Sequence, residues 1–332
     1  MEKRLIFIAS APRSGSTWFS NLFNSHPDIL YRHEPLARLA PFMDSLLLYR
    51  LKHAHGLTEK ERQNLLELLH HAHPESDRPP FFPKSFSRFP PQGRFLCWAA
   101  ATKWPIAGKF YEKFFSTPST EKILVLKETG WSAHIESILD GLKPSASIFL
   151  LRHPCAIIAS ILRGINSGLM RVPSPMAKQE WYAHHYSTAL LRENGLLQDD
   201  ILKADPLTFW ALRLRVLYDI FLELAAKYKD GISIVVYEDI QKEPLEETTA
   251  LYSQLRIPLD ENVQQFISAS TGKTGSTLQA IQKKGRRSYF GVHRQRNYDP
   301  MYWKKELSTE EIEKICMIVG DYILHKFWPT HH

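Results

Sequence analysis

Cysteine is scarce in this chain of 332 residues, where only Cys97, Cys155 and Cys316 occur. Their odd number and wide spacing do not fit a disulfide framework, and no Cys-x-x-Cys or mixed Cys/His spacing of a metal site is present. We therefore expect reduced, buried thiols and no bound metal.

Long apolar runs are also missing. No stretch approaches the roughly 20 apolar residues that a membrane-spanning helix needs. The N-terminal apolar run is short and leads into a polar loop, with no segment that resembles a cleavage site. We expect a soluble, cytoplasmic protein without a membrane span.

Repeats, low-complexity tracts and obvious linkers are absent, while 44% of the residues are hydrophobic and 23% are charged. Such a composition is typical of a folded domain rather than a disordered chain. The 42 Lys and Arg exceed the 35 Asp and Glu, and the net charge of +7 favours anionic ligands. We expect a single domain over residues 1–332, and composition leaves its oligomeric state open.

Short apolar runs alternate with helix-compatible segments along the chain. The expected strands are residues 5–8, 29–32, 122–127, 147–151 and 232–237. The expected helices between and after them are residues 16–25, 131–139, 154–165 and 206–228. This alternation predicts an α/β fold with a P-loop-like parallel sheet covered by helices on both faces.

The remaining segments are predicted to be helical and loop insertions, at about 36–115 and 167–205, and C-terminal helices. Residues 36–71 are expected to form two helices parted near Gly56, the second with a capping box of Thr58 and Glu61. Further helices are expected at residues 177–195, 244–255, 259–268 and 309–327. The Pro- and Phe-rich stretch 73–94 is either a disordered excursion or a lid over a site.

The segment from Leu5 to Trp18 reads as strand, tight loop and helix. Such a loop directs backbone N–H groups and a helix N-terminus at one point, where an anion can bind. Arg13 adds a cation, and Ser14, Ser16 and Thr17 add hydroxyl groups. The loop lacks the leading glycine and the lysine of a Walker A motif, because Ser10 and Ser16 stand at those positions. An ordinary nucleoside triphosphatase is thus disfavoured.

Residues Arg13 to Trp18, followed by His26-Pro27-Asp28, resemble the phosphosulfate-binding loop of sulfotransferases that use 3′-phosphoadenosine 5′-phosphosulfate (PAPS). The similarity is strongest to the carbohydrate and tyrosylprotein branches. It implies that PAPS is the cofactor, that 3′,5′-adenosine bisphosphate (PAP) is the product, and that the cofactor contacts Arg13, Ser14, Gly15, Ser16, Thr17 and Trp18.

A second resemblance concerns the 3′-phosphate. In the family this phosphate is bound by an arginine at a strand end and a serine eight residues later, and Arg152 and Ser160 have that spacing here. A guanidinium fork and a hydroxyl suit a terminal phosphate. More loosely, Lys284 and Gly285 resemble the C-terminal cofactor loop. Tyr237-Glu238-Asp239 also resembles a family turn, which we expect to be structural.

The catalytic groups implied by the resemblance are Glu34, Arg13, Lys127 and Ser276. Glu34-Pro35-Leu36 is similar to the Glu-Pro-Leu of carbohydrate sulfotransferases, so Glu34 is the predicted base, with His33 as the competitor. Lys127 ends a predicted strand at the edge where ligands bind in open α/β sheets. No metal is needed, because side chains supply the positive charge.

The resemblance predicts in-line transfer of a sulfuryl group from PAPS to a hydroxyl or amine of a carbohydrate or small-molecule acceptor. Two alternatives stay open at this point. A P-loop nucleotide kinase or nucleotide-binding module would prefer ATP with Mg²⁺. A nucleic-acid-binding protein would need a basic stripe with stacking aromatics, for which only residues 283–305 offer the composition. We expect no nucleic-acid partner.

Overall fold

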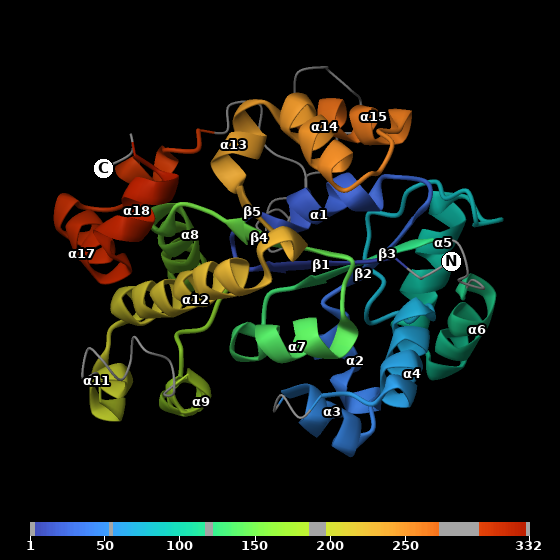
Figure 1. The fold of residues 1–332 in the computed structure, drawn as a ribbon, viewed down its shortest axis with the longest axis horizontal. Helices are drawn as coiled ribbons and strands as arrows, with labels where there is room; N and C mark the ends of the chain where they lie inside the picture. The colour runs from blue at the N-terminus through green and yellow to red at the C-terminus, as the bar shows by residue number, and fades with distance from the viewer. Residues whose placement is uncertain (1–3, 53–55, 117–121, 186–196, 272–298, 330–332) are drawn as a thin grey trace.

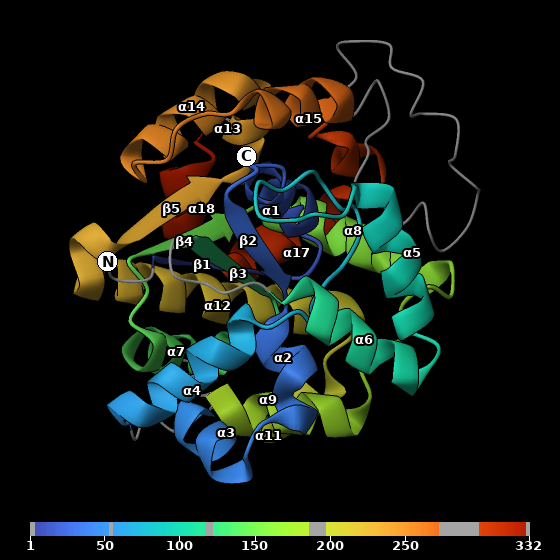
Figure 2. The same ribbon diagram turned by 90° about the vertical axis from the view of Figure 1, so that its right-hand side faces the viewer.

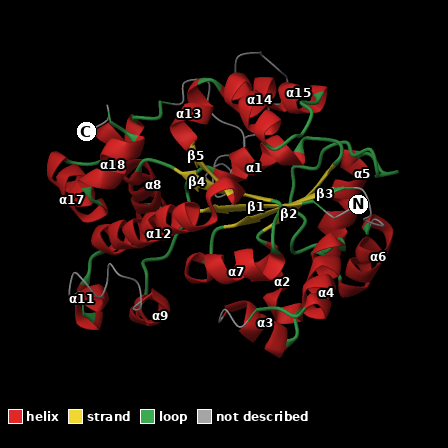
Figure 3. Ribbon diagram, viewed as in Figure 1, coloured by secondary structure: helices red, strands yellow, loops and turns green. Residues whose placement is uncertain are grey.

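A computed structural model of the chain describes residues 4–52, 56–116, 122–185, 197–271 and 299–329. Its centre is a sheet of five parallel strands in the order β2-β3-β1-β4-β5 (Figures 1 and 3). The strands are β1 (Leu5–Ser10), β2 (Ile29–His33), β3 (Ile123–Glu128), β4 (Ala146–Leu151) and β5 (Ile232–Val236). This arrangement confirms the predicted α/β fold.

Alternate strand residues enter two different cores, as the two-residue period of a strand requires. Ile6 and Ile8 of β1 pack with α1 (Ser16–Asn24), α14 (Pro244–Gln254) and α15 (Glu261–Thr271). Leu5 and Phe7 face the opposite core, with α7 (Ile135–Leu142), α8 (Pro154–Asn166) and α12 (Pro206–Tyr228). Both faces of the sheet are therefore covered, and its strands read as continuous apolar runs (Figure 1).

The other helices lie around this core. Those in the first half of the chain are α2 (Pro35–Leu39), α3 (Ser45–Lys52), α4 (Glu59–His70), α5 (Pro91–Ala101) and α6 (Pro105–Phe115). Those in the second half are α9 (Pro175–His185), α11 (Gln198–Lys203), α13 (Tyr237–Lys242), α17 (Thr309–Val319) and α18 (Asp321–Phe327). Short 3₁₀ turns occupy Ala40–Phe42, Ser132–His134, Lys229–Gly231 and Tyr302–Lys305. The predicted capping box of Thr58 and Glu61 begins α4.

The prediction of a single helix over residues 309–327 was wrong. The chain breaks at Gly320 into α17 and α18, where Gly320 has φ 92°. A Cβ atom at this position would lie 2.1 Å from the Arg215 guanidinium, which donates to the carbonyl of Val319 at 2.6 Å. Glycine is thus favoured by the backbone conformation, while the Arg215 guanidinium is the movable end of a flexible side chain.

The stretch 73–90 has no helix or strand, yet it is attached to the sheet at two points. The buried Asp77 accepts hydrogen bonds from Arg32 of β2 (2.7 Å), from Arg94 (2.8 Å) and from Tyr111 (2.8 Å). Lys84 donates to the carbonyls of residues 24, 26 and 29, at the end of α1 and the start of β2. These bonds argue against a disordered excursion. Helices α5 and α6, which follow, were not predicted.

Two expectations from composition can be compared with the structure. Cys155 is buried, but Cys97 on α5 is exposed, so the expectation of buried thiols was wrong for Cys97. Over the described ranges, no helix combines the length and apolar character needed to cross a bilayer.

We predict that Asp77→Ala lowers the free energy of unfolding by about 3–5 kcal/mol, because it leaves the Arg32 and Arg94 guanidinium groups buried without their carboxylate. Urea denaturation measures the change. Glu75→Ala, two residues away on a part-exposed side chain that lies 3.9 Å from Arg78, is the matched control and should cost under about 1 kcal/mol. Equal losses for both variants would contradict the prediction.

Candidate active site

The carboxyl ends of the five strands place the predicted site residues along one edge of the sheet. In the order of the strands, Glu34 follows β2, Lys127 is near the end of β3, residues 11–15 follow β1, Arg152 follows β4 and Tyr237 follows β5. The loop 11–15 therefore lies in the middle, with Glu34 and Lys127 on one side and Arg152 on the other. Ligands of open α/β sheets bind at this edge.

The central loop has the backbone conformation of an anion site. Arg13 has φ 67° and Gly15 has φ 84°, so both lie in the left-handed region that turns consecutive N–H groups to one side. Gly15 is the N-cap residue of α1, and no side-chain hydrogen bond caps the N-terminus of this helix. The first turn of α1 thus presents backbone N–H groups with a positive helix end behind them.

Gly15 is also required by its neighbour Tyr237. A Cβ atom on Gly15 would lie 2.1 Å from the Tyr237 ring. The same ring lies under the Arg152 guanidinium, 4.9 Å from its centroid, and meets the Trp18 ring edge-on at 6.3 Å. Tyr237 therefore holds the loop, the arginine and the base of α1 together, a role that the sequence did not reveal.

The loop and helix α8 are joined by hydrogen bonds between predicted site residues. Arg13 Nε donates to Ser160 Oγ at 3.2 Å, and Arg152 Nη1 donates to the carbonyl oxygen of Arg13 at 2.8 Å. Two cations and one hydroxyl are thereby gathered beside the loop. The structure thus brings the loop motif and the Arg152–Ser160 motif together, although Arg13 and Ser160 are 147 residues apart in the sequence.

The other loop side chains differ in their surroundings. Ser14 is fully buried, and its Oγ has no hydrogen-bond partner within the described ranges. Ser16 is buried and Thr17 is half-buried. The Trp18 ring is 3% exposed, and its Nε1 donates to Ser270 Oγ at 2.9 Å. Trp18 thus packs beneath the loop, and its contact with a cofactor stays a prediction.

A buried carboxylate, Glu238, supports the Arg152 side of the edge. Its Oε1 lies 4.0 Å from Arg152 Nε and accepts from the backbone N–H of His153 at 3.0 Å, while Oε2 accepts from Trp328 at 3.0 Å. Burial raises the pKa of Glu238, and the nearby Arg152 counteracts this. We expected residues 237–239 to be structural, and the contact with Arg152 places Glu238 at the site as well.

Glu34 and Lys127 form an ion pair on the other side of the loop. Lys127 Nζ donates to Glu34 Oε1 at 2.7 Å, Thr129 Oγ1 donates to the same oxygen at 2.7 Å, and Arg38 donates to Oε2 at 3.1 Å. Burial acts to raise the pKa of Glu34, but Lys127 and the other donors outweigh it and lower the pKa. Burial also lowers the pKa of Lys127, which Glu34 opposes.

His33 lies beside this pair and belongs to a chain of hydrogen bonds that leads back to α1. Its Nδ1 is 3.0 Å from the Tyr31 hydroxyl, which is 2.9 Å from Ser20 Oγ, while its Nε2 is 3.8 Å from Glu34 Oε2. Burial and the charge of Lys127 lower the pKa of His33 to about 3. The imidazole is therefore neutral near pH 7, and it is a weak base.

Glu128 is a buried carboxyl group that the sequence analysis did not single out. Its Oε1 accepts from the backbone N–H of Leu36 at 2.6 Å, next to Glu34, and burial raises its pKa to about 8. It holds the first turn of α2, whose preceding residue Glu34 has φ 51°. Glu128 thus positions Glu34 through the backbone.

Three predicted residues, Ser276, Lys284 and Gly285, lie outside the described residues. In the described part of the chain, no group of three or more His, Cys, Asp or Glu residues is placed to hold a metal ion.

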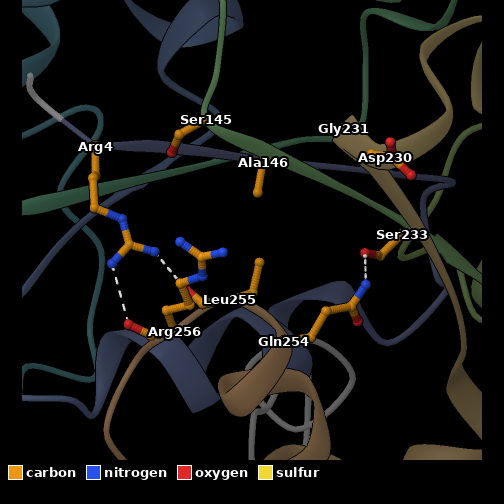
Figure 4. Close-up of a pocket in the computed structure, with 9 residues that line it drawn as sticks. All are labelled: Arg4, Ser145, Ala146, Asp230, Gly231, Ser233, Gln254, Leu255 and Arg256. Carbon is orange, nitrogen blue, oxygen red and sulfur yellow. Dashed lines mark hydrogen bonds between the residues drawn. The ribbon is translucent and has the colours of Figure 1, made fainter.

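A hollow of about 470 Å³ lies at the opposite end of the sheet (Figure 4). It is lined by residues that precede β1, β4 and β5, among them Arg4, Ser145 and Asp230. The Arg4 guanidinium is turned to the carbonyls of residues 255 and 256 (Figure 4). None of the predicted site residues lines it, so it is separate from the candidate active site.

The chain belongs to the sulfotransferase family, whose model matches residues 5–261. This range includes the central loop, Glu34, Lys127, Arg152 and Ser160. No curated protein matched in a sequence search.

Three solved structures illustrate the fold likeness. The sulfotransferase domain from the curacin biosynthetic pathway has 16% identity and a TM-score of 0.45, covering 100% of this chain and 92% of its own. The sulfotransferase domain of the Synechococcus PCC 7002 olefin synthase has 18% identity and a TM-score of 0.46, with 96% and 97% covered. Mouse SULT7A1, complexed with PAP, has 10% identity and a TM-score of 0.47, with 99% and 85% covered. Likenesses of this size assign no substrate and no residue role.

The free energy of unfolding of the wild type should fall as pH rises, because Glu128 loses its proton. We predict that Glu128→Gln abolishes this pH-dependent fall. The pKa of Glu128 is higher in the folded than in the unfolded state, so the folded protein binds the proton more tightly, and stability falls as pH rises from about 5 to about 8. Glutamine keeps the acceptor for Leu36 and has no proton to lose.

Urea titrations at both pH values measure the difference between variant and wild type. Glu310→Gln, on the exposed first turn of α17, is the matched control and should follow the wild type. A constant difference between Glu128→Gln and wild type at the two pH values would contradict the prediction.

Proposed function

We propose that this sulfotransferase takes its sulfuryl group from PAPS and transfers it to a hydroxyl or amine of a carbohydrate or small-molecule acceptor, with Glu34 as the base. The observation that carries the proposal is the order of groups along the sheet edge. Arg152 and Ser160 lie on one side of the loop, where both are bonded to Arg13 of the loop, and the Glu34–Lys127 pair lies on the other side. Donor and acceptor can then meet over the loop.

The residues around the loop fit a nucleotide with two separate phosphate groups. The backbone N–H groups of residues 15–17, the Arg13 guanidinium and the orphaned Ser14 hydroxyl would hold the 5′ phosphosulfate. Arg152 and Ser160, one strand further along the edge, would hold the 3′-phosphate. PAPS supplies an activated sulfuryl group, and it leaves as PAP.

Glu34 is placed to accept the proton of the attacking group. In an in-line transfer the acceptor oxygen forms the new bond to sulfur, the bond from sulfur to the phosphate oxygen breaks, and the acceptor proton passes to the carboxylate. The charge on the leaving phosphate oxygen is stabilised by Arg13 and the loop N–H groups. The protein mainly positions the reactants and compensates charge.

The Glu34–Lys127 bond implies a link between donor binding and basicity. In the free protein Lys127 lowers the pKa of Glu34 and makes it a weak base. A sulfuryl group on the loop would attract the Lys127 ammonium, which lies one strand away. When Lys127 turns toward the donor, it no longer lowers the pKa of Glu34. Glu34 then becomes a stronger base for the proton of the acceptor.

We predict that Arg152→Ala weakens PAP binding by about 10- to 100-fold, because it removes charge-assisted hydrogen bonds to a phosphate. Isothermal titration calorimetry measures the change. Arg163→Ala, a half-exposed arginine on α8, the helix that follows Arg152, is the matched control and should bind PAP like the wild type. A change below threefold in Arg152→Ala would contradict the assignment of the 3′-phosphate site.

We predict that Glu34→Gln lowers the turnover rate by about 10²- to 10⁴-fold, the usual contribution of a general base. PAP affinity should stay within threefold of wild type, because Glu34 lies on the acceptor side of the loop. The assay follows PAP formation from PAPS with a panel of hydroxyl and amine acceptors. His33→Gln is the comparison, and a loss in His33→Gln with normal turnover in Glu34→Gln would make His33 the base.

A further inference from the structure

Large apolar side chains are exposed on the outer surface of helices α5 and α6, which pack together as a hairpin at the periphery of the fold (Figure 2). Ile106 is 74% exposed, Leu96 68% and Trp104 62%. We call the set the hairpin face, and it comprises Phe95, Leu96, Trp104, Ile106, Phe110 and Phe114. Single exposed apolar residues are ordinary, but six within 20 residues of one hairpin indicate an interaction surface.

Helix α6 is apolar on two opposite sides. Gly108, Tyr111 and Phe115 are buried against the protein. Ile106, Phe110 and Phe114 recur every fourth residue and so form one outward stripe, in which the last two rings stack with centroids 6.4 Å apart. A surface helix of a folded domain normally has one apolar side, which packs on the protein, and a polar side toward water. In the described residues, the protein covers only the first of the two apolar sides of α6.

Positive charge borders this stripe. Lys103, Lys109 and Lys113 are exposed, and Lys109 and Lys113 precede Phe110 and Phe114 on α6. The nearest acid on α6, Glu112, lies 3.5 Å from His73. The charge that the hairpin presents to a partner is therefore mainly positive, and it complements an anionic surface.

A hollow of about 500 Å³ adjoins the lysines. It is lined on one side by Lys109, Glu112 and Lys113 of α6 and on the other by residues 68 and 71–73. The lysines thus stand between the apolar stripe and this hollow. An apolar stripe bordered by lysines matches a membrane interface, where acyl chains meet lipid phosphates.

The hairpin is held rigidly against the sheet. Arg94 of α5 and Tyr111 of α6 both donate to the buried Asp77, which also accepts from Arg32 of β2. Glu34 follows β2 directly. A surface that docks on the hairpin therefore has a fixed position relative to the strand that carries the proposed base.

We propose that the hairpin face docks on the surface of an anionic phospholipid bilayer. The aromatic and aliphatic side chains enter the boundary between headgroups and acyl chains, and the lysines contact lipid phosphates. The helix lies on the membrane and does not cross it, since α6 has only 11 residues. A second copy of the chain is disfavoured as the occupant, because a two-fold contact would bring the lysines of both copies together.

Vesicle co-sedimentation of the full chain tests the proposal, without nucleotide or acceptor, so the result does not depend on sulfuryl transfer. The probes are vesicles of phosphatidylcholine alone and with about 30% phosphatidylserine, at about 0.15 M salt. We expect binding to the anionic vesicles only. Lys109→Glu with Lys113→Glu should weaken it by more than about tenfold, since each lysine near such a surface contributes about fivefold. Ile106→Ser with Phe110→Ser should abolish it.

Two controls make the test specific. Lys326→Glu on α18 and Met176→Ser with Met317→Ser, all exposed elsewhere on the protein, should bind like the wild type. Wild-type protein that stays in the supernatant with anionic vesicles overturns the proposal, as does binding that the hairpin variants leave unchanged. Light scattering without lipid tests whether a second copy of the chain occupies the hairpin face instead. A wild-type dimer that the hairpin variants convert to a monomer also overturns the proposal.

Discussion

The hydrogen bond from Arg152 Nη1 to the carbonyl of Arg13 is the contact around which the candidate site is arranged. It joins the end of β4 to the loop after β1, so that the cations of two separate motifs face one region. Tyr237 supports both, and its ring fills the space that a side chain on Gly15 would need. The loop conformation, the arginine and the start of α13 therefore depend on one another.

Charge at the sheet edge is divided into two sets with different environments. Arg13 and Arg152 are the groups that we propose bind the phosphates of the nucleotide. Lys127 instead is buried and is already bound to Glu34, whose pKa it lowers. Because buried charges are stable only in pairs, a ligand that attracts Lys127 must also change the state of Glu34. In the proposed mechanism, this bond couples donor binding to acceptor activation.

The sequence predicted the sheet, the central loop and α1 well, because strands buried on both faces are continuous apolar runs and the loop has a family pattern. It did not predict α5 and α6, whose aromatic residues face both the protein and the outside. Nor did it reveal the roles of Glu128 and Glu238, because their contacts arise from the tertiary fold. Gly320 was missed although glycine is a helix stop signal, and its positive φ ends α17 at this point.

The central claim is that the loop and the Arg152 side of the edge bind one nucleotide through two phosphates. Calorimetry with PAP and with AMP, which lacks the 3′-phosphate, tests it most directly. We predict that PAP binds at least about tenfold more tightly than AMP, and that ATP with Mg²⁺ does not compete. Equal affinity for PAP and AMP would contradict it.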